Sequence, residues 1–308
     1  MEPIPLDALS TTAHGVARPE DLTVTPDGRV LASDAASAVA EILPDGGIRR
    51  IGSAGGEPNG ICALADGSVL IANFALGVLQ QLDLRTGRVE IVVDRIGDDP
   101  LGAVNYPVVD AHGAVWVSSS TRGDPAAAVL DGVPDGFVFR VDGDGNARVV
   151  ADGIPFANCM AFDAGEEHLY VCRSSLADVA RFAVDGGELG PAERYGPALG
   201  GRRDDEFGPD HAGAFGDPEV MRRWALTDGC GFDAEGNLWV TLMTANRVVA
   251  ITPELRVVTV IDDPDGKVLV APTSVAWAGD DLRDLYIGSL VADYVVTARS
   301  PVAGSARP

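Results

Sequence analysis

Residues 227–240 read TDGCGFDAEGNLWV and combine three features: the oxygen-bearing side chain of Asp228, a turn at Glu235-Gly236 eight positions later, and the apolar strand that follows. Five further segments of the chain repeat this order of oxygen-bearing residue, turn and strand. Two of the six copies have one extra residue in the turn. The oxygen-bearing residues that hold the shared position are Glu20, Asn59, Asn105, Asn158, Asp228 and Ser274.

These repeats predict an all-β fold. Successive copies lie 39 to 70 residues apart, and a second strand hairpin follows most of them. Repeats of roughly 40 to 50 residues with about four short strands each are typical of a β-propeller rather than a sandwich or an α/β fold. We therefore expect a six-bladed β-propeller with a central channel. Since no Pro/Ser/Gly-rich linker or charge break divides the repeats, residues 1–308 are expected to form one domain.

The shared position predicts a ring of side chains. In a propeller the innermost strand of every blade runs along the central channel, so equivalent residues converge at one mouth. The ring would hold two carboxylates, three amides and a hydroxyl. Such oxygen ligands suit one hard divalent cation, with Ca²⁺ favoured and Mg²⁺, Mn²⁺ or Zn²⁺ possible. The alternative is that these residues cap turns or bind channel water. Asp21 is expected on the opposite side of its strand, as a surface or turn residue.

Several segments resemble the senescence marker protein/regucalcin/gluconolactonase family of six-bladed propellers. The resemblance spans about residues 15–299, and residues 228–240 are its most specific part. It is also carried by Pro19-Glu20-Asp21, by NYPVVDAHGAVWV at 105–117 and by FANCMAFD at 156–163. It implies a metal-binding propeller with an enzymatic function.

The resemblance also implies roles for individual residues. Members hold a divalent metal with a Glu, an Asn and an Asp that match Glu20, Asn158 and Asp228. Asn105 matches an Asn that contacts metal or substrate, and Asp228 matches an Asp with a catalytic role. The related diisopropylfluorophosphatase likewise uses a Glu, two Asn and an Asp on one calcium. The resemblance therefore implies two sets of residues. The metal ligands are Glu20, Asn105, Asn158 and Asp228, and the catalytic residues are Asp228 and Asn105. Ala103 departs from the gluconolactonase pattern, which has an Arg two residues before the blade-three Asn.

Two insertions lengthen the spacing between ring positions, at about 119–136 and 196–226. The longer one contains His211 and a plausible helical turn at 218–224, and it leads directly to Asp228. Long loops at a channel mouth commonly carry function, so we expect a lid there. The candidates for substrate contact are His211 and the ring residues Asn59 and Ser274.

Composition restricts the possible partners and location. A net charge of −23 argues against binding to nucleic acid or to an anionic membrane surface. The four cysteines contain no Cys-x-x-Cys pair, so neither a zinc site nor a disulfide framework is indicated. The first residues lack the basic and apolar regions of a signal peptide, and no window approaches about 18 consecutive apolar residues. A cytoplasmic protein is expected, and its oligomeric state stays open.

The ring also suggests a reaction. A metal open on one side beside a carboxylate can polarise an ester or phosphoryl oxygen and activate water. The sequence has no Gly-x-Ser-x-Gly elbow, His-Glu-x-x-His helix or P-loop. We therefore predict a divalent-metal-dependent hydrolase of a lactone or related cyclic or activated ester, with a small-molecule substrate. The alternatives are organophosphate hydrolysis, a non-hydrolytic biosynthetic reaction, or a non-catalytic propeller that binds calcium or a partner.

Overall fold

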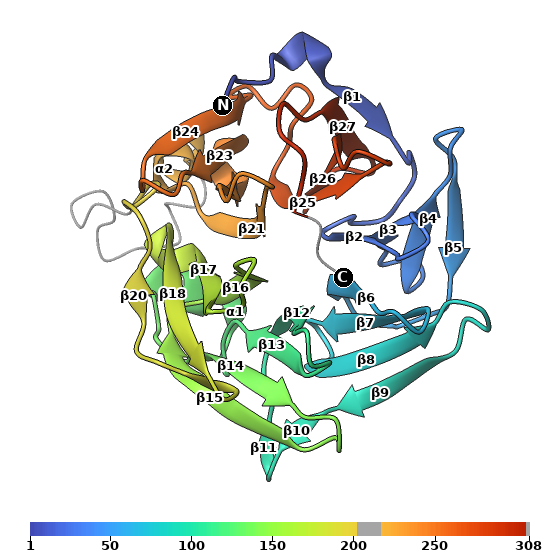
Figure 1. The fold of residues 1–308 in the computed structure, drawn as a ribbon, viewed down its shortest axis with the longest axis vertical. Helices are drawn as coiled ribbons and strands as arrows, with labels where there is room; N and C mark the ends of the chain where they lie inside the picture. Colours follow the sequence, from blue (N-terminus) through green and yellow to red (C-terminus); the bar gives the residue numbers. More distant parts are fainter. Residues whose placement is uncertain (202–216, 306–308) are drawn as a thin grey trace.

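The strands of the protein are arranged in sheets around a central axis (Figure 1). The structure is a computed structural model that describes residues 1–201 and 217–305. Within these residues six sheets of four or five strands surround the axis, and one two-stranded hairpin lies outside them. This arrangement confirms the predicted all-β, six-bladed propeller.

Each blade begins with its innermost strand, and the other strands follow outward from the axis. The first three blades are formed by β2 (Leu22–Val24), β3 (Val30–Ser33), β4 (Val39–Ile42) and β5 (Ile48–Ile51); by β6 (Pro58–Ala63), β7 (Ser68–Asn73), β8 (Val78–Asp83) and β9 (Val89–Val93); and by β12 (Val104–Val109), β13 (Val115–Ser119), β14 (Gly136–Val141) and β15 (Ala147–Ile154). The last three are formed by β16 (Ala157–Phe162), β17 (His168–Arg173) and β18 (Asp178–Asp185) with β19 (Glu188–Leu189) and β20 (Glu193–Arg194); by β21 (Thr227–Phe232), β22 (Leu238–Leu242), β23 (Arg247–Ile251) and β24 (Val257–Asp262); and by β25 (Pro272–Ala278), β26 (Asp284–Ser289), β27 (Val295–Arg299) and β1 (Ser10–Thr12). The separate hairpin pairs β10 (Arg95–Ile96) with β11 (Asp99–Pro100).

The first strand of the chain closes the ring. β1 pairs antiparallel with β27, in a register that joins Ser10 to Thr297 and Thr12 to Val295. The sixth sheet is therefore built from both ends of the described chain. Because β1 pairs with the backbone of β27, that strand is not left as an open sheet edge.

A hydrogen-bond network around Asp233 explains why residues 227–240, one copy of the repeated segment, fold into a hairpin. One carboxylate oxygen of Asp233 accepts hydrogen bonds from the backbone N–H groups of Glu235 and Asn237, both at 2.9 Å. The other oxygen accepts from the indole N–H of Trp239 at 2.8 Å. Gly236 has a φ of +80°, a left-handed conformation that disfavours side chains. Asp233, Gly236 and Trp239 thus each have a structural role in this hairpin.

The core lies between the blades. Six clusters of buried apolar side chains each join one blade to the next around the ring. For example, Trp239 of blade five packs edge-to-face on Trp277 of blade six, with ring centroids 5.2 Å apart. Burial of each large apolar side chain contributes about 1.5–3 kcal/mol. Each innermost strand also contacts the innermost strands of both neighbouring blades, so residues at their ends are brought together.

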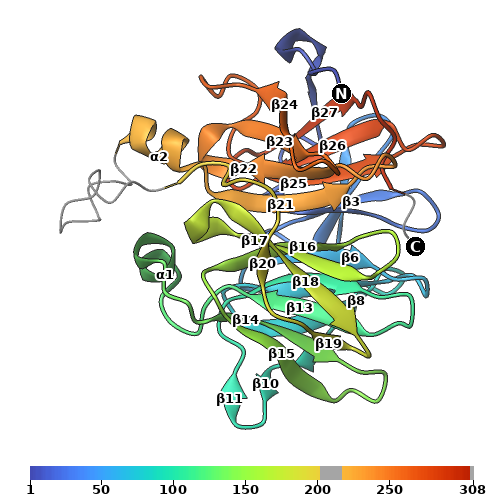
Figure 2. The same cartoon turned by 60° about the vertical axis from the view of Figure 1, so that its left-hand side comes forward.

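Of the described residues, the short helices α1 (Pro125–Asp131) and α2 (Pro218–Trp224) lie on one side of the ring, as Figure 2 shows. α1 begins at the N-cap Asp124, which accepts from the Ala127 N–H at 2.9 Å. α2 begins at Asp217 and matches the helical turn expected at 218–224. Single 3₁₀ turns occur at η1 (Leu6–Ala8), η2 (Ser174–Leu176) and η4 (Met243–Ala245). Among the described residues, no helix has the length and apolar character needed to cross a membrane.

Candidate active site

Five of the six predicted ring residues line one cavity of about 270 Å³ at the end of the channel where the innermost strands begin. Their side chains come from blades one to five, and each residue is only 2–6% exposed. The structure therefore brings together the following residues: Glu20, Asn59, Asn105, Asn158 and Asp228.

Local irregularities of the innermost strands position four of these residues. Each is the second residue of its strand, and the pairing with the next strand shifts register there. A β-bulge bends the strand and re-aims the side chain at the bulge. The shifts occur between Pro58 and Ile61, Val104 and Tyr106, Ala157 and Met160, and Thr227 and Cys230.

Asn105 and Asn158 are each oriented by a serine of the adjacent strand or turn. Nδ2 of Asn158 donates to Ser174 Oγ at 3.1 Å, and Ser174 Oγ donates to the Thr227 carbonyl of the next blade at 2.6 Å. Nδ2 of Asn105 likewise donates to Ser120 Oγ at 3.0 Å. Because the amide nitrogens are held in this way, the amide oxygens are left for another ligand.

Two buried oxygens in the cavity lack hydrogen-bond partners among residues 1–201 and 217–305: Oδ1 of Asn105 and Oδ1 of Asp228. A buried oxygen without a partner costs about 1–3 kcal/mol, and a cation would remove this cost. Together with Glu20 and Asn158, these groups form a set of four oxygen donors with two negative charges. No group of three His, Cys, Asp or Glu side chains in the described part of the chain could hold a metal, so amide oxygens would have to complete the set.

The electrostatics of the cavity also favour a cation. Burial raises the pKa of Glu20 to about 7. Burial also raises the pKa of Asp228 well above its usual value, and the negative charge of Glu20 adds to this shift. The positive charge of Arg18 opposes both shifts. A divalent cation would stabilise both ionised carboxylates.

Arg18 is a cavity residue that sequence reasoning missed. Its guanidinium donates to Asn59 Oδ1 at 2.8 Å and to the Pro58 carbonyl at 3.1 Å. Its backbone has a φ of +57°. The sequence did contain a signal for Arg18. Arg18 lies two residues before the ring residue Glu20, just as Ala103 lies two residues before the ring residue Asn105. An arginine thus occupies in blade one the position that is alanine in blade three.

The three candidates for substrate contact have different placements. Asn59 lines the cavity, but its Oδ1 accepts from Arg18 and its Nδ2 donates to the Asn105 carbonyl at 3.3 Å. Ser274 is 3% exposed and does not belong to the residues that line the cavity. His211 lies outside the described residues, as does the rest of 202–216. The structure thus makes Asn59 a support for Arg18.

The expectation for Asp21 was wrong. Asp21 is 1% exposed, and one carboxylate oxygen accepts from the Ile61 N–H of blade two at 2.7 Å. Burial and the charge of Glu20 raise its pKa well above the usual range. Alternation along a strand does not bring a side chain to the surface here, because both faces of an innermost strand pack against other blades.

Apolar side chains form another part of the lining of the cavity. They come from loops and short helices at the end of the blades where the cavity lies, including both insertions. α1 lies in the insertion at 119–136, and the longer insertion contributes a residue just before β21. We use "apolar wall" for Phe74, Val129, Phe156, Leu226, Met243 and Leu290.

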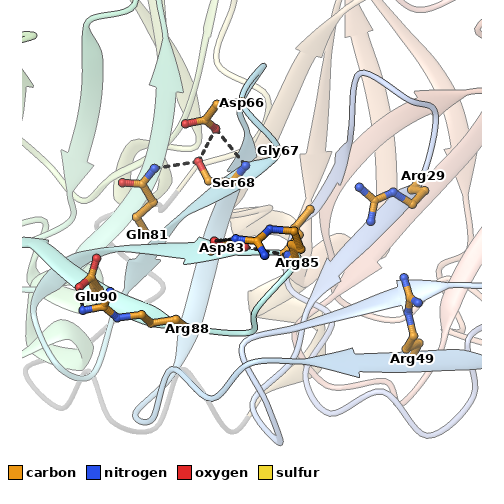
Figure 3. A pocket seen from close by; sticks show the side chains of 11 residues that line it. Arg29, Arg49, Asp66, Gly67, Ser68, Gln81, Asp83, Arg85, Arg88 and Glu90 are labelled. Carbon is orange, nitrogen blue, oxygen red and sulfur yellow. Dashed lines mark hydrogen bonds and ion pairs between the residues drawn. The ribbon is translucent and has the colours of Figure 1, made fainter.

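A larger cavity of about 790 Å³ lies elsewhere, at the turns of blades one and two (Figure 3). Four arginines line it, but each forms an ion pair with a nearby carboxylate. Arg85 and Arg88 have side chains that are 84% and 73% exposed. This cavity is therefore a solvated surface network, and the ring residues line the smaller cavity instead.

Comparison with known proteins identifies relatives of this chain. A family model described as SMP-30/Gluconolactonase/LRE-like region matches residues 27–291. Pentonolactonase XacC of Haloferax volcanii is 29% identical over 189 residues, which cover 58% of this chain and 56% of that protein. The 6-deoxy-6-sulfogluconolactonase of Pseudomonas putida is 27% identical over 205 residues, which cover 64% of this chain and 58% of that protein. The chain thus matches little more than half of each of these curated relatives.

A solved structure has the same fold. A gluconolactonase from Xanthomonas campestris superposes with a TM-score of 0.74 and 18% sequence identity over 95% of this chain and 89% of that chain. The family match begins at residue 27, after Glu20. The position of Glu20 in the site therefore rests on the geometry of the cavity described above.

Proposed function

Because the chain belongs to the SMP-30/gluconolactonase/LRE-like family, we propose that it is a divalent-metal-dependent hydrolase of a lactone or a related cyclic or activated ester. The named lactonases among its relatives support lactone hydrolysis. The observation that carries the proposal is the pair of unpartnered buried oxygens, Asn105 Oδ1 and Asp228 Oδ1, in the described part of a cavity that also contains Glu20.

The proposed metal ligands are Glu20, Asn105, Asn158 and Asp228. Four oxygen donors with no sulfur or imidazole favour Ca²⁺ among the divalent ions, and the two carboxylates match its charge. When bound, such an ion supplies Lewis-acid polarisation of an ester carbonyl and lowers the pKa of water. The serine contacts of Asn105 and Asn158 keep both amide oxygens directed away from the adjacent strands.

Asp228 is the proposed general base. One carboxylate oxygen of Asp228 would accept a proton from water while the water oxygen forms a bond to the lactone carbonyl carbon. The ring C–O bond then breaks, and the proton passes from Asp228 to the departing alkoxide oxygen. The product is a hydroxy acid, which releases a proton to solvent at neutral pH. Asn105 would contact either the metal or the substrate carbonyl.

Arg18 is proposed to orient the substrate. A guanidinium has five N–H donors, and the contacts with Asn59 and Pro58 use two of them. Further donors are available to an ester oxygen or to the carboxylate of the product. Asn59 acts through Arg18, so it is a positioning residue in this scheme.

The test is proton release by pH-stat on a panel of lactones, aryl esters and phosphotriesters, with chelator-treated protein before and after Ca²⁺ is added. We expect lactone hydrolysis that depends on the added ion. Glu20→Gln should weaken Ca²⁺ binding by about 100-fold or more in calorimetry, since it removes one of two ligand charges. The matched control is Glu57→Gln, which changes an exposed glutamate just before β6.

Two results would contradict the proposal. Wild-type Ca²⁺ affinity in Glu20→Gln would show that this cavity is not the metal site. Absence of lactone and ester hydrolysis by protein that binds the ion with one-to-one stoichiometry would show that the metal serves another reaction or a binding role.

A further inference from the structure

The walls of the cavity point to a substrate class. We propose that the substrate is a lactone with an alkyl or aryl substituent that packs against the apolar wall, rather than a polyhydroxylated sugar lactone. This inference rests on the proposed hydrolase function and specifies its substrate. It distinguishes this chain from the relatives whose names refer to sugar lactones.

Five of the six residues of the apolar wall, all except Leu290, belong to or pack against one buried cluster and are not a chance group of exposed side chains. Val129, Phe156 and Leu226 are 8%, 8% and 2% exposed. They pack in one cluster with Trp224 of α2, and Phe74 and Met243 pack against the same cluster. The wall therefore exists before substrate binds, and binding would remove further apolar area from water.

The polar groups of the cavity offer few hydrogen-bond donors to sugar hydroxyls, because its carboxylate and amide oxygens can only accept and, apart from that of Asn59, are the proposed metal ligands. Ser174 Oγ donates to the Thr227 carbonyl and accepts from Asn158, so its hydrogen is used. The amide nitrogens of Asn59 and Asn105 each donate one of their two hydrogens within the protein. Of the described lining residues, Arg18 is the main source of donors. A hydroxyl that faces the apolar wall would lose its bonds to water without replacement.

The size of the cavity limits the substituent. Its volume of about 270 Å³ lies slightly below the range of roughly 300–1,000 Å³ that is common for small-molecule sites. A five- or six-membered lactone ring with a short substituent is suited to such a space. Each methylene buried on the wall should raise kcat/KM about fourfold until the wall is covered.

The first experiment compares a series of δ-lactones on Ca²⁺-loaded wild-type protein by pH-stat. The series has no substituent, methyl, propyl and pentyl groups, and glucono-δ-lactone is the polar comparison. We expect kcat/KM to rise along the series by about fourfold per methylene at first, and glucono-δ-lactone to be the poorest substrate. A higher kcat/KM for glucono-δ-lactone than for the propyl lactone would overturn the inference.

A substitution on the wall tests the contact itself. Leu290 is partly exposed, so Leu290→Asn should fold, and it places an amide where the substituent would lie. It should lower kcat/KM for the propyl lactone about tenfold, a change typical for one lost apolar contact, and should lower kcat/KM for the unsubstituted lactone by a smaller factor. Leu255→Asn is the matched control, at a 48% exposed leucine between β23 and β24. Equal effects of Leu290→Asn on both lactones would overturn the inference.

Binding of non-hydrolysable lactams separates this inference from the proposed function. Calorimetry should show tighter binding of a propyl-substituted lactam than of the glucono-lactam. If the propyl lactam binds more tightly but no lactone is hydrolysed, the inference that the apolar wall binds the substituent holds and the hydrolase proposal fails. If lactones are hydrolysed but the glucono-lactam binds more tightly, the inference that the apolar wall binds the substituent fails and the hydrolase proposal holds.

Discussion

Asp228 is one of two carboxylates that line the central cavity, and its Oδ1 has no hydrogen-bond partner within residues 1–201 and 217–305. Asp228→Asn keeps an oxygen ligand of nearly the same shape but removes the charge and basicity. We expect kcat for the best lactone to fall by about 100-fold or more, the range for a lost general base. Activity must be measured at saturating Ca²⁺, so that metal occupancy does not limit the rate.

The control for this substitution is Asp99→Asn, which changes an exposed aspartate in β11. It should keep wild-type kcat. A kcat for Asp228→Asn within about twofold of wild type, at full metal occupancy, would assign proton acceptance to another group.

The raised pKa of Glu20 predicts that the stability of protein stripped of divalent ions depends on pH. This pKa is about 7 in the folded protein, against an ordinary value of 4.5. Between these pH values the folded state binds more protons than the unfolded chain, so stability falls as pH rises. The free energy of unfolding should decrease by up to about 3 kcal/mol through this group, as measured by urea titrations between pH 5 and 8.

Two comparisons isolate the contribution of Glu20. The pH-dependent loss should be smaller in Glu20→Gln, which has no carboxyl to titrate. It should also be smaller in wild type with Ca²⁺, because a bound cation favours the ionised carboxylate. Equal pH profiles for wild type and Glu20→Gln would show that Glu20 does not carry this charge penalty.

At the scale of elements, the serine between neighbouring blades couples the site to the fold. Ser174 in η2 joins Asn158 of β16 to the Thr227 carbonyl of β21. Ser174→Ala leaves two buried polar groups without this partner. We expect unfolding free energy to fall by about 1–3 kcal/mol and Ca²⁺ affinity to fall by about tenfold, a typical effect of removing a group that orients a metal ligand.

Ser175→Ala is the matched control in the same turn. Ser175 Oγ donates to the Ala128 carbonyl at 3.3 Å and does not contact a ring residue in the described structure. It should reduce stability without changing Ca²⁺ affinity. Equal Ca²⁺ affinities for the two variants would contradict a role for Ser174 in orienting Asn158.

The hairpin between β21 and β22 depends on one aspartate. Asp233→Ala removes the acceptor for two backbone N–H groups, the Asn237 side chain and the Trp239 indole. Because the side chain is 2% exposed, water cannot readily replace these bonds. We expect a loss of about 3 kcal/mol in unfolding free energy by urea titration. Asp83→Ala, at a 47% exposed side chain at the end of β8, should cost less than about 1 kcal/mol.

At the scale of the whole molecule, stability depends on closure of the ring. Deletion of residues 1–12 removes β1 from β27 and removes Ile4 and Leu9 from the cluster between blades five and six. The lost burial of these two side chains is worth about 3–6 kcal/mol. The thermal midpoint should therefore drop by on the order of 10 °C. A soluble deletion variant with an unchanged, cooperative transition would show that β1 does not stabilise the closed ring.

The sequence by itself determined the repeat of the fold, in which six copies of one unit of strands and turns follow each other along the chain. Strand periodicity and turn residues are local properties, and six in-register copies of an oxygen-bearing residue, a turn and a strand leave few folds other than a propeller. The convergence of Glu20, Asn59, Asn105, Asn158 and Asp228 followed from that symmetry, because equivalent positions of innermost strands meet at the axis. The helix at 218–224 was also readable, since Asp217 and Pro218 form a local helix start.

Tertiary structure alone decided which other side chains reach the site. The apolar wall comes from loops and short helices whose positions depend on packing between blades, and the spacing of residues along the chain does not encode those contacts. Arg18 has a readable register two residues before Glu20, but its hydrogen bonds with blade two come from the packing of the blades. Asp21 shows the same limit: alternation predicted exposure, but the neighbouring blade buries it and supplies the Ile61 N–H as a partner. The convergence of five ring residues was therefore predictable from the repeats, whereas the other walls of the cavity depend on contacts between residues far apart in sequence.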